Sequence, residues 1–206
     1  MSAALALWRG LGRALGPAVR LWLRRRARRG REDPARLPER LGRPSAARPE
    51  GPLLWLHGAS VGEALALLSL AEALRAARPG LALLLTTGTR SSAEVVAARA
   101  PAALIHQMAP VDAAGAPVRF LAHWRPDLAV FAESELWPGL IDAAARAGAG
   151  PVLVNARLSE ASTRGWGRAP ALARAVFGRL ALVLAQDATA ASRFRALGAP
   201  RVEVTG

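Results

Sequence analysis

The sequence contains no cysteine and only three histidines, His57, His106 and His123. Without cysteine there can be no disulfide framework, no thiolate ligand for a metal and no thiol nucleophile. Three scattered histidines are also a poor basis for a zinc site. These absences exclude disulfide-stapled domains and cysteine enzymes, and they leave no metal site that the sequence signals.

Acidic residues are absent from the first 29 positions and sparse in the first 50. Residues 1–50 contain 13 Arg and 4 acidic residues, a net charge of +9, whereas residues 51–206 contain 15 Arg and 11 acidic residues, a net charge of +4. A nucleic-acid-binding domain would carry its basic residues on the folded surface, so we expect no nucleic-acid partner. The asymmetry favours a local anionic partner such as a membrane surface.

Residues 1–29 combine apolar residues at helical spacing with arginines on another face. Charges interrupt every window of transmembrane length, and there is no clean apolar run of the kind found in signal peptides. We expect residues 1–29 to be a basic amphipathic membrane anchor and residues 30–52, which are rich in proline, to be a linker. A disordered basic tail and a mitochondrial transit peptide remain alternatives. The apolar stripe comprises Leu5, Trp8, Leu11, Leu15, Val19 and Trp22, and the basic face comprises Arg9, Arg13, Arg20 and Arg24.

From residue 53 onward, short apolar segments alternate with amphipathic helical segments. This alternation predicts a doubly wound, mostly parallel, Rossmann-like α/β sheet over residues 53–206. The carboxyl ends of its strands would meet along one rim, where ligands bind. Ser91 to Glu94 reads as a capping box that opens the second helix. Expected strands are 53–57, 81–87, 103–106, 128–132, 152–155, 181–185 and 202–205, with helices near 63–78, 113–123, 138–147, 170–179 and 189–197.

Two glutamates follow strands at the expected rim. The first strand ends at His57, the glycine-containing turn 58–62 reverses the chain, and a helix opens near Glu63. A carboxylate at a helix N-terminus is stabilised by the backbone N–H groups there. Together with Glu133, which follows the fourth strand, it is suited to proton transfer or to stabilising a cationic transition state. Neither a G-x-G-x-x-G nor a Walker pattern occurs, so no nucleotide cofactor is signalled.

Residues 58–62 also match the G-x-S-x-G nucleophile elbow of α/β-hydrolases. In that alternative Ser60 would be the nucleophile, with Asp112 and His123 completing a triad in the right order. However, a hydrolase elbow follows several earlier strands, and here only an arginine-rich segment precedes it. A non-catalytic, membrane-associated module is a second alternative.

Several stretches, in order, resemble the N-terminal half of 3-deoxy-D-manno-octulosonic acid (Kdo) transferases. The two longest, ESELWP at 133–138 and NARLS at 155–159, are chemically unusual and therefore specific. The resemblance extends over essentially the whole chain from about residue 36. The other matching residues are ERLG at 39–42, ASVGE at 59–63, TTGT at 86–89, PVD at 110–112, RFL at 119–121, AQ at 185–186, Arg193, LG at 197–198 and VTG at 204–206.

The resemblance implies a GT-B glycosyltransferase with its site between two Rossmann-like domains. This chain would be the acceptor-binding domain at the cytoplasmic face of the inner membrane, and the donor-binding C-terminal domain would be missing from these 206 residues. The family transfers Kdo from CMP-Kdo to the lipid A precursor (lipid IVA) with inversion, in lipopolysaccharide synthesis, without metal or cofactor. Glu63 would be the general base and Glu133 the residue that stabilises the transition state. The chain alone would be inactive.

Further residues are assigned with their structural alternatives. We expect Ser60, Gly62, Thr87, Asn155 and Arg157 to contact substrate, although Ser60 also suits a helix cap. The structural alternative for Glu133 is an ion pair with an arginine such as Arg157. Glu135 is expected to orient its loop, His57 to be packed, and Trp137 to lie in the core.

Overall fold

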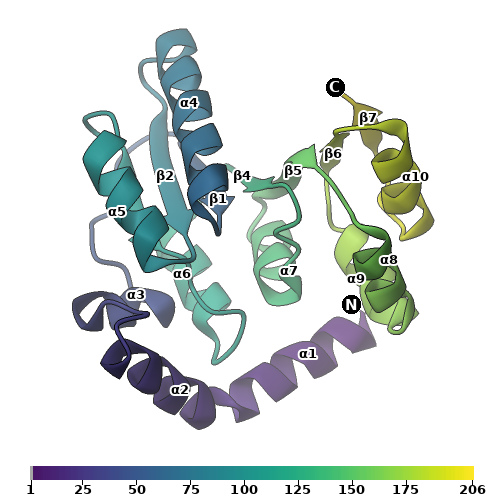
Figure 1. Ribbon diagram of the computed structural model, residues 1–206, viewed down its shortest axis with the longest axis horizontal. Helices are drawn as coiled ribbons and strands as arrows, with labels where there is room; N and C mark the ends of the chain where they lie inside the picture. The colour runs from purple at the N-terminus through teal and green to yellow at the C-terminus, as the bar shows by residue number, and fades with distance from the viewer. Residues whose placement is uncertain (1) are drawn as a thin grey trace.

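The computed structural model describes residues 2–206, and its centre is one seven-stranded sheet in which every strand pair is parallel. The strand order is β3-β2-β1-β4-β5-β6-β7 (Figure 1). The chain runs outward from β1 to β3, returns to β4 beside β1, and continues outward to β7, so the order reverses between β1 and β4. The predicted doubly wound, Rossmann-like fold is confirmed. The strands are β1 (Leu53–Gly58), β2 (Ala82–Thr87), β3 (Ile105–Met108), β4 (Leu128–Ala132), β5 (Gly150–Ala156), β6 (Leu182–Ala185) and β7 (Val202–Val204).

Helices cover both faces of the sheet because the crossovers on the two sides of the reversal lie on opposite faces. On one face, α4 (Val61–Ala77) and α5 (Arg90–Arg99) pack Leu67 and Val96 against β1 and β2. The other face holds the aromatic core, in which Trp55 packs against Phe120 and Phe131 at centroid distances of 4.8 and 5.1 Å. Its helices are α6 (Ala116–Trp124), α7 (Pro138–Arg146), α9 (Pro170–Phe177) and α10 (Ala188–Ala196).

Three local features differ from the prediction. The third strand begins at Ile105, two residues late, because Ala103 adopts a left-handed conformation with φ of +71° that ends a turn. The second helix begins at Arg90, and its capping box is formed by Thr89 and Ser92 rather than by residues 91–94. An additional helix, α8 (Glu160–Gly167), is capped by Ser159. The sequence of α8 has only a weak apolar periodicity, so the sequence did not predict this helix.

The N-terminal segment forms two helices, α1 (Ala3–Ala14) and α2 (Gly16–Arg28), which meet at Leu15 and lie along the lower edge of the molecule in Figure 1. Leu5 and Leu23 are buried against the domain. The Gly12 carbonyl accepts a hydrogen bond from the Ala114 N–H at 2.7 Å. Of the predicted stripe, Leu5 is buried, whereas most of the other residues face outward. The exposed fractions of Leu11, Leu15 and Trp22 are 54%, 56% and 48%.

The described helices include none with the length and apolarity needed to cross a bilayer. Residues 30–52, expected as a linker, contain η1 (Pro34–Arg36) and α3 (Leu37–Arg40) and pack beside β3. The buried Glu39 accepts hydrogen bonds from Arg36 and, at 2.5 Å, from the Met108 N–H. This connecting segment is thus tied to the sheet by buried, paired charges.

Candidate active site

The rim at the reversal point between β1 and β4 is built around the turn from β1 into α4. Gly58 ends the strand, and a Cβ atom at this position would lie 2.9 Å from the Glu63 Cβ. Only glycine therefore lets the first turn of α4 approach the strand so closely. The turn brings the start of α4, with its unpaired N–H groups, to the carboxyl end of the sheet, where ligands bind in folds of this class.

The Glu63 carboxylate is held by two hydrogen bonds from this turn. Its Oε1 accepts from the Ser60 hydroxyl at 2.7 Å, and its Oε2 accepts from the Ala59 N–H at 2.8 Å. Ser60 is also the N-cap of α4, since its Oγ accepts from the Glu63 N–H at 3.2 Å. The side chain is partly exposed. A carboxylate with each oxygen bonded once is oriented, yet each oxygen keeps a lone pair for a further proton donor.

The same contacts argue against the hydrolase alternative. The Ser60 hydroxyl is bonded to a carboxylate, whereas the His123 Nε2 contacts the carbonyl of Ala46 at 2.9 Å. His123 lies near the end of α6, which leads into the start of β4 at the opposite end of the sheet from the rim. A triad of Ser60, Asp112 and His123 is not assembled.

Glu133 and Asn155 occupy neighbouring strand ends in unusual backbone conformations. Both have positive φ angles, +52° and +50°, which for residues other than glycine cost on the order of 1–3 kcal/mol and cluster at functional sites. Glu133 forms an ion pair with Arg157 at 2.6 Å, while Asn155 accepts a hydrogen bond from the Gln186 side chain at 2.8 Å. The structure thus contains the ion pair that was the alternative for Glu133, in a backbone that keeps the carboxylate at the rim.

A buried chain of polar contacts connects the core to Glu135. The Trp55 indole donates to the Thr86 hydroxyl at 2.8 Å, and this hydroxyl lies 2.9 Å from the His57 Nδ1. The His57 Nε2 lies 3.4 Å from the Glu135 Oε2. Glu135 also accepts from the Trp137 indole at 2.5 Å. These contacts anchor the 133–137 loop.

The electrostatics of Glu135 follow from the same contacts. Burial alone would raise the pKa of its carboxyl group, but the hydrogen bond and charge of His57, with the Trp137 indole, bring this pKa below its usual value. Glu135 is therefore held as a carboxylate, as expected of a residue that orients its loop. His57 is buried, which confirms that prediction.

Two side chains are not placed as expected. The prediction that Trp137 lies in the core is wrong, because 46% of its surface is exposed and only its indole N–H is tied down. Thr87 is fully buried and bonded to the His106 Nε2 at 2.9 Å. It has no surface left for a substrate in this conformation, so we no longer expect direct contact. Gly62, Ser60, Asn155 and Arg157 do lie exposed along the rim.

Sequence reasoning assigned no role in the transferase site to Asp112, which connects three elements. Its carboxylate accepts hydrogen bonds from the Trp8 indole at 2.9 Å and from the N–H groups of Gly139 and Leu140 at 2.9 and 2.7 Å. It thereby caps α7 and fastens α1. Burial raises the pKa of Asp112 to about 6, although the three hydrogen bonds oppose this shift. Only its position in the PVD stretch could have drawn attention to it.

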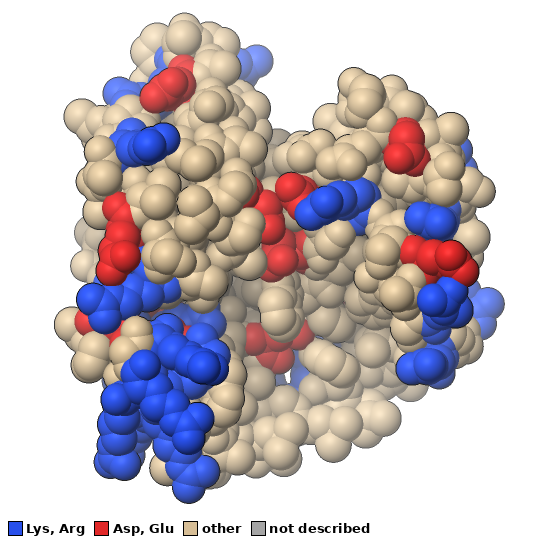
Figure 2. Space-filling view, in the orientation of Figure 1, with Lys and Arg blue, Asp and Glu red and all other residues tan. Residues whose placement is uncertain are grey.

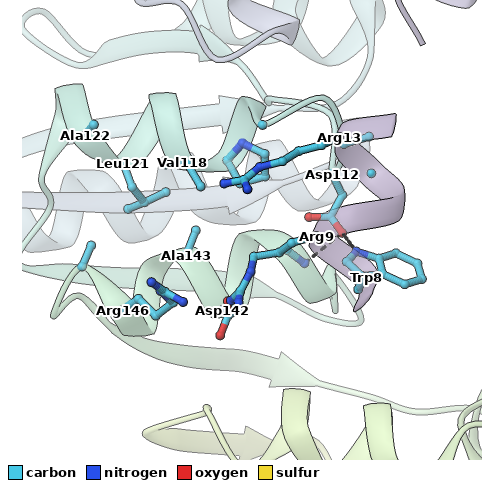
Figure 3. A pocket seen from close by; sticks show the side chains of 16 residues that line it. Trp8, Arg9, Arg13, Asp112, Val118, Leu121, Ala122, Asp142, Ala143 and Arg146 are labelled. Carbon is cyan, nitrogen blue, oxygen red and sulfur yellow. Dashed lines mark hydrogen bonds and ion pairs between the residues drawn. The ribbon is translucent and has the colours of Figure 1, made fainter. Parts of the chain in front are cut away.

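Two cavities flank Asp112, and the N-terminal helices form a wall of each. One, of about 480 Å³, lies between α1, α6 and α7, where Arg9 forms an ion pair with Asp142 at 2.5 Å (Figure 3). The other, of about 530 Å³, we call the apolar groove. One wall carries Leu15, Val19 and Trp22, and the opposite wall carries the rim residues Ala59, Glu135 and Trp137. The groove therefore runs from the amphipathic helices to the turn that presents Glu63.

Figure 2 shows a hollow between the α4–α5 side and the α8–α10 side of the molecule. Acidic side chains lie at its centre, with a basic side chain beside them, and a cluster of basic side chains covers the lower left. A carboxylate-containing hollow bordered by cationic groups can accept a proton and can hold an anionic molecule at its edge.

Comparison with known proteins gives a consistent result. A family profile described as 3-Deoxy-D-manno-octulosonic-acid transferase (kdotransferase) matches residues 35–206. A probable mitochondrial 3-deoxy-D-manno-octulosonic acid transferase of Arabidopsis thaliana is 41% identical over 160 residues, which are 78% of this chain and 36% of that protein. The Bordetella pertussis 3-deoxy-D-manno-octulosonic acid transferase is 38% identical over 205 residues, 94% of this chain and 47% of that protein. The chain thus spans between a third and a half of these relatives.

Proposed function

This chain belongs to the family of Kdo transferases, and we propose that it is the acceptor-binding half of a glycosyltransferase that transfers Kdo from CMP-Kdo to the lipid A precursor (lipid IVA) with inversion. The observation that carries this proposal is the Glu63 carboxylate, oriented at the N-terminus of α4 on the rim. A second, donor-binding domain would close over this rim and supply the groups that hold CMP.

In the proposed reaction, Glu63 removes the proton from a primary hydroxyl of the acceptor sugar. The freed oxygen attacks the anomeric carbon of Kdo, the bond from that carbon to the CMP phosphate breaks, and CMP leaves with the electron pair. A single displacement of this kind inverts the configuration at the carbon. The hydrogen bonds from Ser60 and Ala59 would aim the carboxylate, and positioning of a base in this way typically contributes about 10²–10⁴-fold to the rate.

Glu133 would stabilise the transition state. Positive charge develops at the anomeric carbon as the leaving group departs, and a fixed carboxylate offsets it. The left-handed backbone at Glu133 and the ion pair with Arg157 hold this carboxylate in place. Ser60, Gly62, Asn155 and Arg157 border the space in which the acceptor sugar would lie, and we retain them as proposed substrate contacts.

We further propose that the N-terminal helices attach the protein to the cytoplasmic face of an anionic inner membrane. Leu7, Leu11 and Leu15 form an outward apolar stripe, and the arginines of α2 lie beside it. Such a surface suits insertion of the apolar residues at the headgroup level, with arginines on anionic lipids. The apolar groove would then open from the membrane side toward Glu63.

The proposal is tested with Glu63→Gln in a full-length transferase that contains this chain. We expect kcat to fall by roughly two to four orders of magnitude with KM little changed, because the amide cannot take the proton. Glu94→Gln is the matched control, since Glu94 is an exposed glutamate of α5 that forms an ion pair with Arg90. Near-normal turnover by Glu63→Gln, or a product of retained configuration, would contradict the mechanism.

A further inference from the structure

A separate polar cavity of about 400 Å³ lies at the ends of β5 and β6, on the far side of Glu133 from the apolar groove. We call it the serine–arginine pocket. It receives side chains from the 133–137 loop, from the loop after β5, and from the starts of α8 and α10. The polar residues that line it are Ser134, Arg157, Ser159, Ser162, Asp187 and Arg193.

Two guanidinium groups and one carboxylate line this pocket, and Arg157 is already paired with Glu133 outside it, so Arg193 is the cation to consider. Arg193 is held by the Leu158 carbonyl, to which its guanidinium donates at 2.7 Å, and no carboxylate of the described residues forms an ion pair with it. A carbonyl orients a guanidinium without cancelling its charge. The one carboxylate of the lining, Asp187, is turned onto α10, where it accepts the Ala190 N–H at 2.6 Å. Arg193 therefore presents a fixed cation to the cavity.

Hydroxyl donors complete the lining. The Ser159 hydroxyl donates to the Ser162 Oγ at 3.0 Å, while its own oxygen accepts the Ser162 N–H at 3.1 Å. The Ser162 Oγ thus accepts a hydrogen bond, and no acceptor among the described residues takes its hydroxyl proton. An oriented guanidinium beside a hydroxyl with a proton to donate is the pairing that binds phosphoryl oxygens.

We propose that the serine–arginine pocket binds a phosphoryl group through Arg193 and Ser162, with Arg157 closing the side toward Glu133. Arg157 is shared between the pocket and the Glu133 ion pair, and Ser134 follows Glu133 directly. A phosphoryl group in this pocket therefore lies close to the Glu133 carboxylate. Its assignment to a phosphate monoester on the acceptor sugar rests on the proposed function, whereas phosphate affinity itself does not.

The test is a titration of the isotopically labelled 206-residue chain followed by NMR, at constant ionic strength. Inorganic phosphate should produce saturable shifts at the amides of Ser162 and Ala190. Arg193→Gln should weaken the apparent affinity at least tenfold, and Ser162→Ala should weaken it severalfold without touching the Leu158 contact. Arg195→Gln is the matched control, because Arg195 lies on the same helix, donates to the Val202 carbonyl and is not part of the pocket lining; this variant should bind as the unaltered chain does.

Glucose 1-phosphate, glucose and CMP distinguish the sources of the group. We expect the sugar phosphate to bind with the same dependence on Arg193, and glucose not to bind. CMP also carries a phosphate monoester, so we expect it to compete no more strongly than glucose 1-phosphate; stronger competition by CMP would overturn the assignment to the acceptor. Absence of saturable shifts, or equal weakening by Arg193→Gln and Arg195→Gln, would overturn the pocket itself. Because no transfer is measured, failure of the proposed enzymatic activity would leave this result standing.

Discussion

Two glycines with the same backbone angle allow the packing of residues 30–52 to be tested. Gly42 and Gly51 both have φ of +76°, a conformation that L-residues rarely adopt. They differ in surroundings. A Cβ atom at Gly42 would lie 2.1 Å from the Ala116 carbonyl oxygen, whereas one at Gly51 would have nothing within 4 Å. Replacing each with alanine therefore separates the cost of the angle from the cost of the collision.

The left-handed angle costs about 1–2 kcal/mol for a residue with a Cβ, and it applies to both variants. The loss of unfolded-state freedom on changing Gly to Ala also applies to both. Only Gly42→Ala must displace the backbone at the start of α6, and overpacking of this kind typically adds about 1–3 kcal/mol. We therefore expect Gly42→Ala to be less stable than Gly51→Ala by roughly 1–3 kcal/mol.

Urea unfolding of the 206-residue chain measures this difference. With a slope of about 1–3 kcal/mol per molar urea for both variants, the midpoint of Gly42→Ala should lie roughly 1 M below that of Gly51→Ala. Gly30→Ala, at φ of +69° with open surroundings, provides a second control and should match Gly51→Ala. Equal midpoints for Gly42→Ala and Gly51→Ala would refute the close packing of this segment on α6.

Three further predictions concern pH, membrane and domain organisation. The folded pKa of Asp112 is raised from 3.8 to about 6, so the stability that its protonated form contributes is complete below pH 3.8 and is lost as pH rises through 6. Between pH 4 and pH 7 the unfolding free energy of Asp112→Asn should therefore rise by about 2–3 kcal/mol relative to that of the unaltered chain. A difference in urea unfolding that stays constant with pH would contradict this. The double variant Leu11→Ser, Leu15→Ser should bind anionic vesicles at least tenfold more weakly in a sedimentation assay, because burying one leucine contributes about 1.5–3 kcal/mol. Val204→Ser, which changes a similarly exposed apolar residue outside the N-terminal helices, should leave vesicle binding unchanged. The 206-residue chain alone should not transfer Kdo from CMP-Kdo to the lipid A precursor, because positioning by the donor half is worth roughly 7–11 kcal/mol; measurable turnover by the chain alone would refute that division.

Much of the sheet could be predicted because its signals are local. Each buried parallel strand is an apolar run, and each crossover helix has its own periodicity, so the strands were located to within about two residues. The main deviation, at β3, arises from the left-handed Ala103, for which an alanine gives no local signal. The short α8, whose sequence is interrupted by glycines, was missed for the same lack of a periodic pattern.

The position of Glu63 at the start of a helix was also a local property, because Ser60, the glycine turn and Glu63 lie within six residues. The contacts that arrange the rest of the site were not. The Trp8–Asp112 and Arg9–Asp142 contacts join residues 104 and 133 positions apart. Glycine has a low helix propensity, yet Gly12 lies within α1, where it packs against Ala113 and its carbonyl accepts the Ala114 N–H, which helps to seat α1 on the domain.

Sequence by itself determined the order of strands and helices, the charge asymmetry and the rim position of Glu63, since each depends on neighbouring residues. Tertiary structure alone decided that His57 faces Glu135, that Asp112 caps α7 from another loop, and that Leu5 of the apolar stripe is buried while most of the stripe stays exposed. It also brought Arg193 to the same cavity as Arg157, 36 positions earlier. Such pairings depend on which strands lie side by side in the sheet. The local sequence around a residue therefore does not reveal a partner that lies far away along the chain.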